Sequence, residues 1–271
     1  MAHHVHVAPG PGVVGLTLAL AVLYLCGWLR VRLLTSNPLP GWRAASALGG
    51  LATAWLAVAS PIGAGDERLL MFHMVQHLLL MTIAPSLILL GEPVRALWWR
   101  LFESPEEGSG SFRGAAWSRV RAAVGQPAVC WLVATGTLVV WHIPAAFTLA
   151  LASPFWHAVE QASFLVSGLL FWWPVVQPWP SRPDPRWSTV LYLFLATLPC
   201  DILSGFLVFS DRVAYSVYVS RSSGLAVLDD QQRAGALMWT VVTLVYLVAG
   251  TIVSTRILAT PSHRHQLAEA V

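Results

Sequence analysis

Long runs of apolar residues, separated by short polar or proline-containing breaks, recur along the whole sequence. Most of these runs approach or exceed the roughly 18 to 20 residues that an α-helix needs to cross the hydrocarbon of a bilayer. The pattern predicts an all-α, polytopic membrane protein, a bundle of about seven transmembrane helices. The predicted spans cover residues 13–34, 43–60, 69–91, 127–149, 157–176, 188–209 and 233–257.

These spans divide the chain into three parts. We expect a short, His-containing extracytoplasmic tail at residues 1–12, a seven-helix transmembrane domain at 13–258 and a short cytoplasmic tail at 259–271. The first apolar run has neither a basic leader nor a small-residue cleavage signal, so we expect it to be retained as a helix.

The composition supports the membrane interpretation and excludes a soluble fold. Hydrophobic residues make up 56% of the chain and charged residues only 11%, whereas soluble domains carry about 25% charged residues. The net charge of +3 comes from Arg, because the sequence contains no Lys. These Arg residues lie in connectors beside apolar runs, where they orient membrane proteins, so they do not indicate nucleic-acid binding.

The distribution of Arg predicts the orientation of the chain. Twelve of the sixteen Arg residues fall on one side of the predicted bilayer and four on the other. Because cytoplasmic loops retain the excess of positive charge, we expect the amino terminus outside and the carboxyl terminus in the cytoplasm. The predicted location is the plasma membrane, crossed several times.

Four histidines in the predicted outer half of the bundle are the main candidates for metal ligands. His73 and His77 are four residues apart, which places both imidazoles on one helical face. His142 lies near the outer end of the fourth span, beside Pro144, which should bend that helix. His157 begins the fifth span at the same surface.

Further polar residues at a similar depth are expected to support such a site. Ionisable side chains are costly inside a bilayer and normally face the bundle interior and one another. Imidazole suits copper, zinc and iron, whereas a thioether favours cuprous copper, so histidines beside methionine most resemble a copper site. The expected supporting residues, which would orient the ligands and balance the charge of the ion, are Met74, Glu160, Asp201 and Asp230.

Ordinary structural roles remain open for several of these residues. His157 fits a solvated loop residue, and His142 fits a core histidine bonded to a carbonyl that Pro144 frees. Asp230, with its neighbour Asp229, fits the start of the last helix. The amino-terminal His3, His4 and His6 fit either a cupric chelator or a polar tail.

Several stretches of the chain together resemble the CtaG-type, multi-span cytochrome c oxidase assembly factors of bacteria. They follow the same order as in that family and cover the third, fourth, fifth and seventh spans. The stretches are HMVQHLLLMTIAPSLILLGEP (73–93), WHIPAAFTLAL (141–151), FWHAVEQASFLVSGLLFWWPV (155–175) and DQQRAGALMWTVVTLVYLVAG (230–250).

The resemblance implies a helper protein of the respiratory chain rather than an enzyme. The family is linked to maturation of the copper centres of haem-copper oxidases, so the implied partners are cytochrome c oxidase subunits and the implied ligand is copper. No catalytic residue carries over. Four residues stand at positions of the family pattern: His73, His77, His142 and His157.

The residues also allow three rival functions. A membrane-embedded zinc-dependent hydrolase acting on lipid would use zinc to activate water. A haem-binding electron carrier would ligate one haem with two histidines from different helices. An ion transporter would use Glu160 and Asp201 as relay groups.

Overall fold

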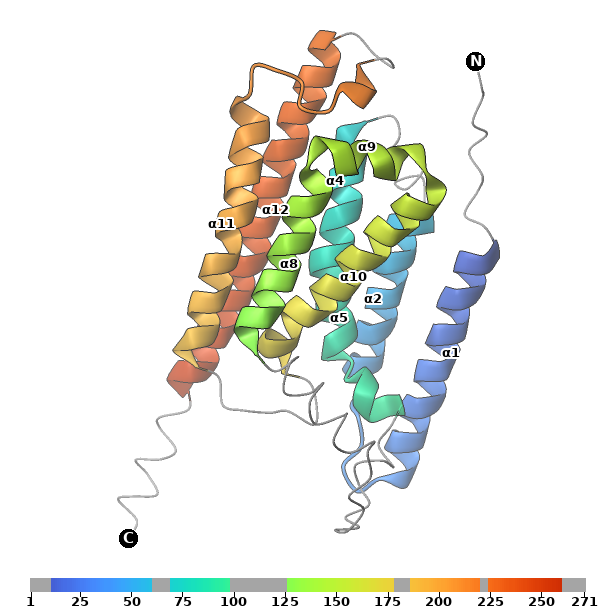
Figure 1. The fold of residues 1–271 in the computed structure, drawn as a ribbon. Helices are drawn as coiled ribbons and strands as arrows, with labels where there is room; N and C mark the ends of the chain where they lie inside the picture. The colour runs from blue at the N-terminus through green and yellow to red at the C-terminus, as the bar shows by residue number, and fades with distance from the viewer. Residues whose placement is uncertain (1–10, 60–68, 98–125, 178–185, 220–223, 260–271) are drawn as a thin grey trace, which may run out of the picture.

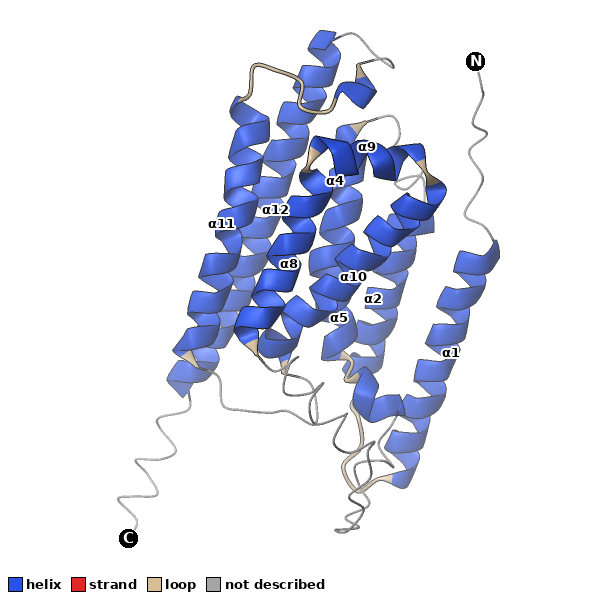
Figure 2. Cartoon of the chain, in the orientation of Figure 1, coloured by secondary structure: helices blue, strands red, loops and turns tan. Residues whose placement is uncertain are grey.

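A computed structural model describes residues 11–59, 69–97, 126–177, 186–219 and 224–259. Within these ranges the regular structure is helical, as Figure 2 shows, which confirms the predicted all-α class. Residues 1–10 of the predicted amino-terminal tail, with His3, His4 and His6, and nearly all of the carboxyl-terminal tail lie outside the described residues, and α1 already begins at Pro11.

The described residues form helical elements in the following order along the chain. Their bounds are α1 Pro11–Leu34, α2 Gly41–Ala59, α4 Leu70–Leu78, the π-helix η1 Leu79–Ile83, α5 Ala84–Leu90, α8 Pro127–His142, α9 Pro144–Ala152, α10 Pro154–Val176, α11 Trp187–Phe209, the 3₁₀ turn η2 Ser216–Tyr218 and α12 Gly224–Ala259.

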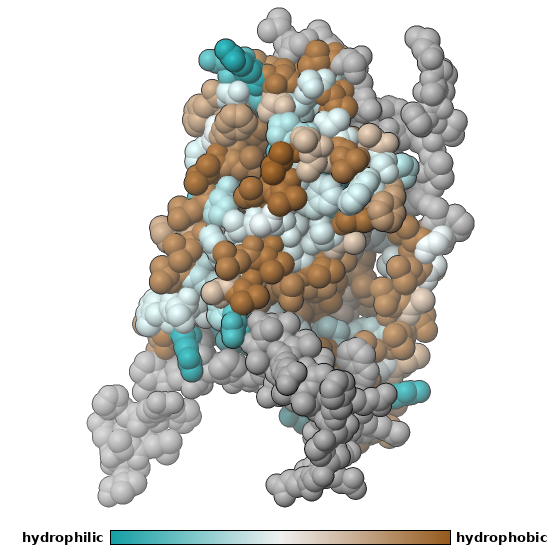
Figure 3. Space-filling model, viewed as in Figure 1, coloured by the Kyte–Doolittle hydropathy of each residue, from teal (hydrophilic) through white to brown (hydrophobic). Residues whose placement is uncertain are grey.

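Five helical segments of the described chain are long and apolar enough to cross a membrane, and a sixth results if α8 and α9 form one span. The predicted count of seven is therefore not confirmed. The difference lies in α2, whose 19 residues include Arg43 and many small residues, which lower its mean hydropathy. Hydrophobic residues, interspersed with residues of intermediate hydropathy, form large patches on the coloured part of the face in Figure 3. The orientation across the membrane remains a prediction.

The bundle has one large core and one small core. The large core joins α4, α8, α10, α11 and α12, and α11 packs along α12 at one edge of the molecule (Figure 1). The small core lies where α1 and α2 meet residues 93–97. Polar contacts support the small core: Arg43 Nη1 lies 2.9 Å from Glu92 Oε1, and the Tyr24 hydroxyl donates to the Gly91 carbonyl.

The π-helix η1 follows His77, and Pro85 in the sequence explains why the regular α-helix is interrupted there. Pro85 has no N–H to donate to the carbonyl of Met81, four residues earlier. Trp172 of α10 supplies the missing donor, with its Nε1 3.2 Å from the Met81 oxygen. Gly168 allows this approach, because a Cβ there would lie 2.7 Å from that oxygen. The proline, the glycine and the tryptophan together hold α10 against η1.

The fourth predicted span, 127–149, is not one continuous helix, because α8 stops at His142. The chain turns there by 76° into α9, which crosses the end of the bundle (Figure 1). Pro144 has no N–H for the Val140 carbonyl, and the preceding Ile143 adopts an extended conformation, as residues before proline prefer. The predicted bend at Pro144 is confirmed.

The last helix begins earlier than the predicted span, which starts at residue 233. The α12 helix begins at Gly224, so Asp229 and Asp230 lie within it rather than at its start. The apolar pattern begins only after the charged residues Asp229, Asp230 and Arg233, so it does not reveal the first turns of α12.

Candidate metal centre

Helices α4 and α10 bring two histidines and one glutamate together in the interior. His73 and His77 lie on successive turns of α4, His77 in its last turn, and Glu160 lies in the second turn of α10. Glu160 Oε1 is 3.5 Å from His73 Nε2 and 3.4 Å from His77 Nε2. Each residue offers one ligand atom such that all three atoms lie within 4.8 Å of one another. This separation allows one metal ion to contact all three.

The three side chains lack ordinary hydrogen-bond partners. Their exposed fractions are 0% for His73, 4% for His77 and 0% for Glu160. All four ring nitrogens and both carboxylate oxygens have no hydrogen-bond partner among the described residues. Buried polar atoms are nearly always hydrogen-bonded, so six such atoms that make only long polar contacts among the described residues require an explanation. A bound cation would satisfy the carboxylate and one nitrogen of each ring.

His157 flanks the centre on the side of α10. Its Nε2 lies 3.3 Å from Gln76 Oε1, 3.1 Å from Gln161 Nε2 and 4.0 Å from Glu160 Oε2. The ring of His157 stacks 6.0 Å from that of His73, and 21% of its side chain is exposed. His157 therefore lies between the buried centre and the surface of the protein.

His142 flanks the centre on the side of α8. Its ring lies 5.7 Å from that of His77. Its Nδ1 lies 2.7 Å from the Leu138 carbonyl, one turn earlier, and its Nε2 lies 3.4 Å from Met74 Sδ. His142 does bond a backbone carbonyl, but it is that of Leu138. The Val140 carbonyl, which Pro144 cannot serve, accepts from the Ile143 N–H at 3.2 Å instead.

Two aromatic side chains cover the centre at the end of the bundle. Phe147 of α9 is fully buried with its ring 4.7 Å from that of His73, and Tyr215 stacks on Phe147 at 4.0 Å. The Tyr215 hydroxyl donates to the His142 carbonyl at 3.2 Å. Burial raises the pKa of Tyr215, which keeps this donor neutral. The bend at Pro144 places α9, and therefore Phe147, over the histidines.

Gln231 of α12 fixes the loop that carries Tyr215. Its Oε1 accepts from the Ala214 N–H at 2.7 Å, and its Nε2 lies 3.2 Å from the Arg212 carbonyl. Gln231 is 1% exposed, so these bonds lie in the interior. No local pattern in the sequence signals the roles of Gln231, Phe147 and Tyr215, because these roles depend on contacts between distant segments.

Asp230 and Asp201 are not part of the group of ligands. Asp230 Oδ2 accepts from the Leu70 N–H at 2.6 Å, so it caps α4, the helix that carries both histidines, instead of its own helix. Asp201 lies on α11, and its Oδ1 has no partner among the described residues.

Replacing Asp230 with Ala is expected to lower the free energy of unfolding by about 0.5–2 kcal/mol, the usual cost of a lost cap. Asp229→Ala is the matched control, since the ion pair of Asp229 with Arg233 is exposed and worth about 0–1 kcal/mol. Thermal melts in detergent compare the two variants. Equal melting temperatures would contradict the capping role.

Comparison with known proteins identifies a family whose model matches most of the chain. A family model described as the cytochrome c oxidase caa3 assembly factor matches residues 22–260. Uncharacterized proteins of Mycobacterium leprae and Mycobacterium bovis are each 25% identical to the chain, over 85% and 84% of its length. The chain spans about a third of these relatives, 36% and 35% of their lengths. No solved structure matches the chain.

Proposed function

The chain belongs to the cytochrome c oxidase caa3 assembly factor family, and from this premise we propose that it holds a copper ion and delivers it to an oxidase subunit. The ion would be bound by His73, His77 and Glu160. Delivery would take place at the outer membrane face, since the centre lies toward the end of the bundle where α1 begins (Figure 1), the end predicted to be outside.

One observation carries the proposal: two imidazoles and one carboxylate converge in the interior with no hydrogen-bond partner among the described residues. Such a group is costly in the absence of a cation, because each unpaired buried polar atom destabilises the fold. A bound divalent or monovalent cation offsets this cost. The stability of the metal-free protein therefore does not explain this arrangement of buried side chains.

The surroundings of the centre favour copper over zinc. Imidazole and carboxylate ligands suit both ions, but the thioether of Met74, which lies beside His142 and is not one of the three holding ligands, offers cuprous copper a neighbouring soft ligand. A zinc hydrolase would also need an open ligand position that water and substrate can reach. Phe147 and Tyr215 cover the centre instead, which suits storage and transfer of an ion better than catalysis.

A deletion strain tests the proposal. We expect loss of the haem-copper oxidase absorption band and of oxidase activity in copper-limited medium, with recovery when copper is added. The wild-type gene and the Asp229→Ala control should restore the oxidase, whereas the His73→Ala, His77→Ala double variant should not. A deletion strain with normal oxidase, or full complementation by the double variant, would reject the proposed function.

A further inference from the structure

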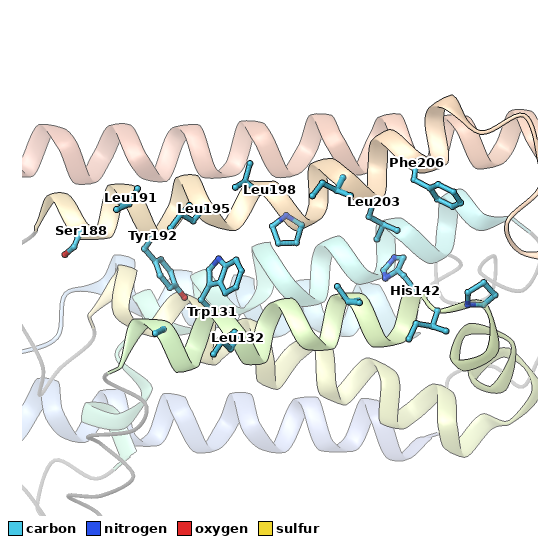
Figure 4. A pocket seen from close by; sticks show the side chains of 16 residues that line it. Trp131, Leu132, His142, Ser188, Leu191, Tyr192, Leu195, Leu198, Leu203 and Phe206 are labelled. Atoms are coloured by element: carbon cyan, nitrogen blue, oxygen red, sulfur yellow. The ribbon is translucent and has the colours of Figure 1, made fainter.

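A long groove runs between α8 and α11 on the surface of the bundle (Figure 4). Its volume is about 1150 Å³. Nearly all of its lining side chains are apolar, among them Leu132 and Val139 of α8 and Leu191, Leu198 and Phe206 of α11. Helix α11 packs extensively on α12 but much less on α8, which leaves the space between α8 and α11.

The length of the groove indicates what fits in it. Its lining extends along α11 from Ser188 to Phe206, which at 1.5 Å per residue is about 27 Å. The hydrocarbon core of a bilayer is about 30 Å thick. A lipid acyl chain belongs to one leaflet and covers about half of this length, whereas a transmembrane helix covers all of it.

His142 connects the groove to the histidine centre. His142 and Pro199 line the groove and also a small internal cavity of about 40 Å³ that His77 lines as well. Figure 4 shows His142 toward one end of the groove and Ser188 toward the other. Phe147 and Tyr215 cover the centre at the end of the bundle, so the connection from the centre to the groove is the small internal cavity that His77 and His142 both line.

The geometry of His142 makes it a ligand for a soft cation. The Leu138 carbonyl only accepts hydrogen bonds, so His142 carries its proton on Nδ1 and has a lone pair on Nε2. That lone pair faces Met74 Sδ at 3.4 Å, and the thioether has no proton to donate. With metal bonds of about 2.0 Å to nitrogen and about 2.3 Å to sulfur, this separation fits two ligands of one ion.

We propose that the α8–α11 groove seats a transmembrane helix of the oxidase subunit that receives copper, and that His142 and Met74 pass the ion to it. This inference rests on the proposed function. The ion keeps its oxidation state: a bond to His77 breaks as a bond to His142 Nε2 forms, and both imidazoles remain neutral. The receiving helix would carry an imidazole or sulfur ligand near the His142 end of the groove.

Photo-crosslinking in native membranes tests the occupant. A photo-reactive amino acid replaces Ile202, which lines the groove and is 74% exposed, or Leu247 of α12, which is 64% exposed and outside the groove. With an epitope-tagged copper-bearing oxidase subunit in the cell, we expect its capture from position 202 and not from 247. Capture of lipid only, of a second copy of this chain, or equal capture from both positions would overturn the docking role.

The variant Met74→Leu tests the transfer. This swap conserves side-chain volume and usually costs less than about 1.5 kcal/mol, so the variant should fold. We expect the purified variant to keep the copper content of the wild type, while oxidase activity in cells falls at least about tenfold.

The outcomes separate transfer from holding. Wild-type oxidase activity in the Met74→Leu strain would overturn the transfer role. Loss of copper from the purified variant would overturn it too, because Met74 would then belong to the holding centre. Absence of copper from the wild-type protein would instead reject the proposed function itself.

Discussion

Copper content is expected to fall from near stoichiometric in the purified wild-type protein to background when His73 and His77 are both replaced by Ala. The two residues supply the imidazoles of the centre, and both are buried beside Glu160. A single carboxylate holds a copper ion too weakly to survive purification. Metal analysis of protein purified from copper-supplied cells measures the change.

Glu160→Gln provides a version of this experiment that preserves the shape of the site. The metal-free variant should be as stable as the wild type or more stable, because the substitution removes a buried charge. Added copper at 100 times its Kd should raise the free energy of unfolding of the wild type by about 2.7 kcal/mol. The variant should gain much less, since its amide is a poorer ligand than a carboxylate.

The triple substitution of His3, His4 and His6 with Ala is the control for the amino-terminal tail. If the buried centre is the binding site, this variant keeps its copper. Copper that disappears with the tail histidines, and persists in the His73→Ala, His77→Ala variant, would place binding in the tail and contradict the buried site. Zinc in place of copper would favour the hydrolase interpretation.

Gly168→Ala is expected to lower the free energy of unfolding by about 1–3 kcal/mol, as overpacking of a filled interior does. The new methyl group would lie 2.7 Å from both the Met81 carbonyl oxygen and Pro85 Cγ. Backbone atoms of η1 cannot rotate away, so α10 must shift. Glu160 lies on the same helix, two turns earlier, so the variant should also bind copper more weakly.

Gly136→Ala is the matched control for this substitution. Gly136 is also inside a helix, but a Cβ there meets no atom within 4 Å. Alanine should therefore stabilise α8 by up to about 1 kcal/mol through helix propensity alone. Thermal melts and copper titrations of both variants make the comparison. A Gly168→Ala protein as stable as the Gly136→Ala protein would show that the contact between α10 and η1 is not tight.

The sequence by itself determined that this is a helical membrane protein, because apolar runs of spanning length leave hardly any other structure available. It also determined that His73 and His77 share a helical face, since four residues make about one turn. The bend beside His142 followed from Pro144, because proline removes a backbone donor. These are local properties, and nearby residues decide them.

Only the tertiary structure decided which groups face one another. It placed Glu160, expected in a supporting role, at contact distance from both histidines, and it assigned Asp230 to the start of α4. The cover formed by Phe147 and Tyr215 joins segments separated by almost 70 residues. Such contacts depend on how helices pack and rotate against one another, and the spacing of residues along one helix does not specify that rotation.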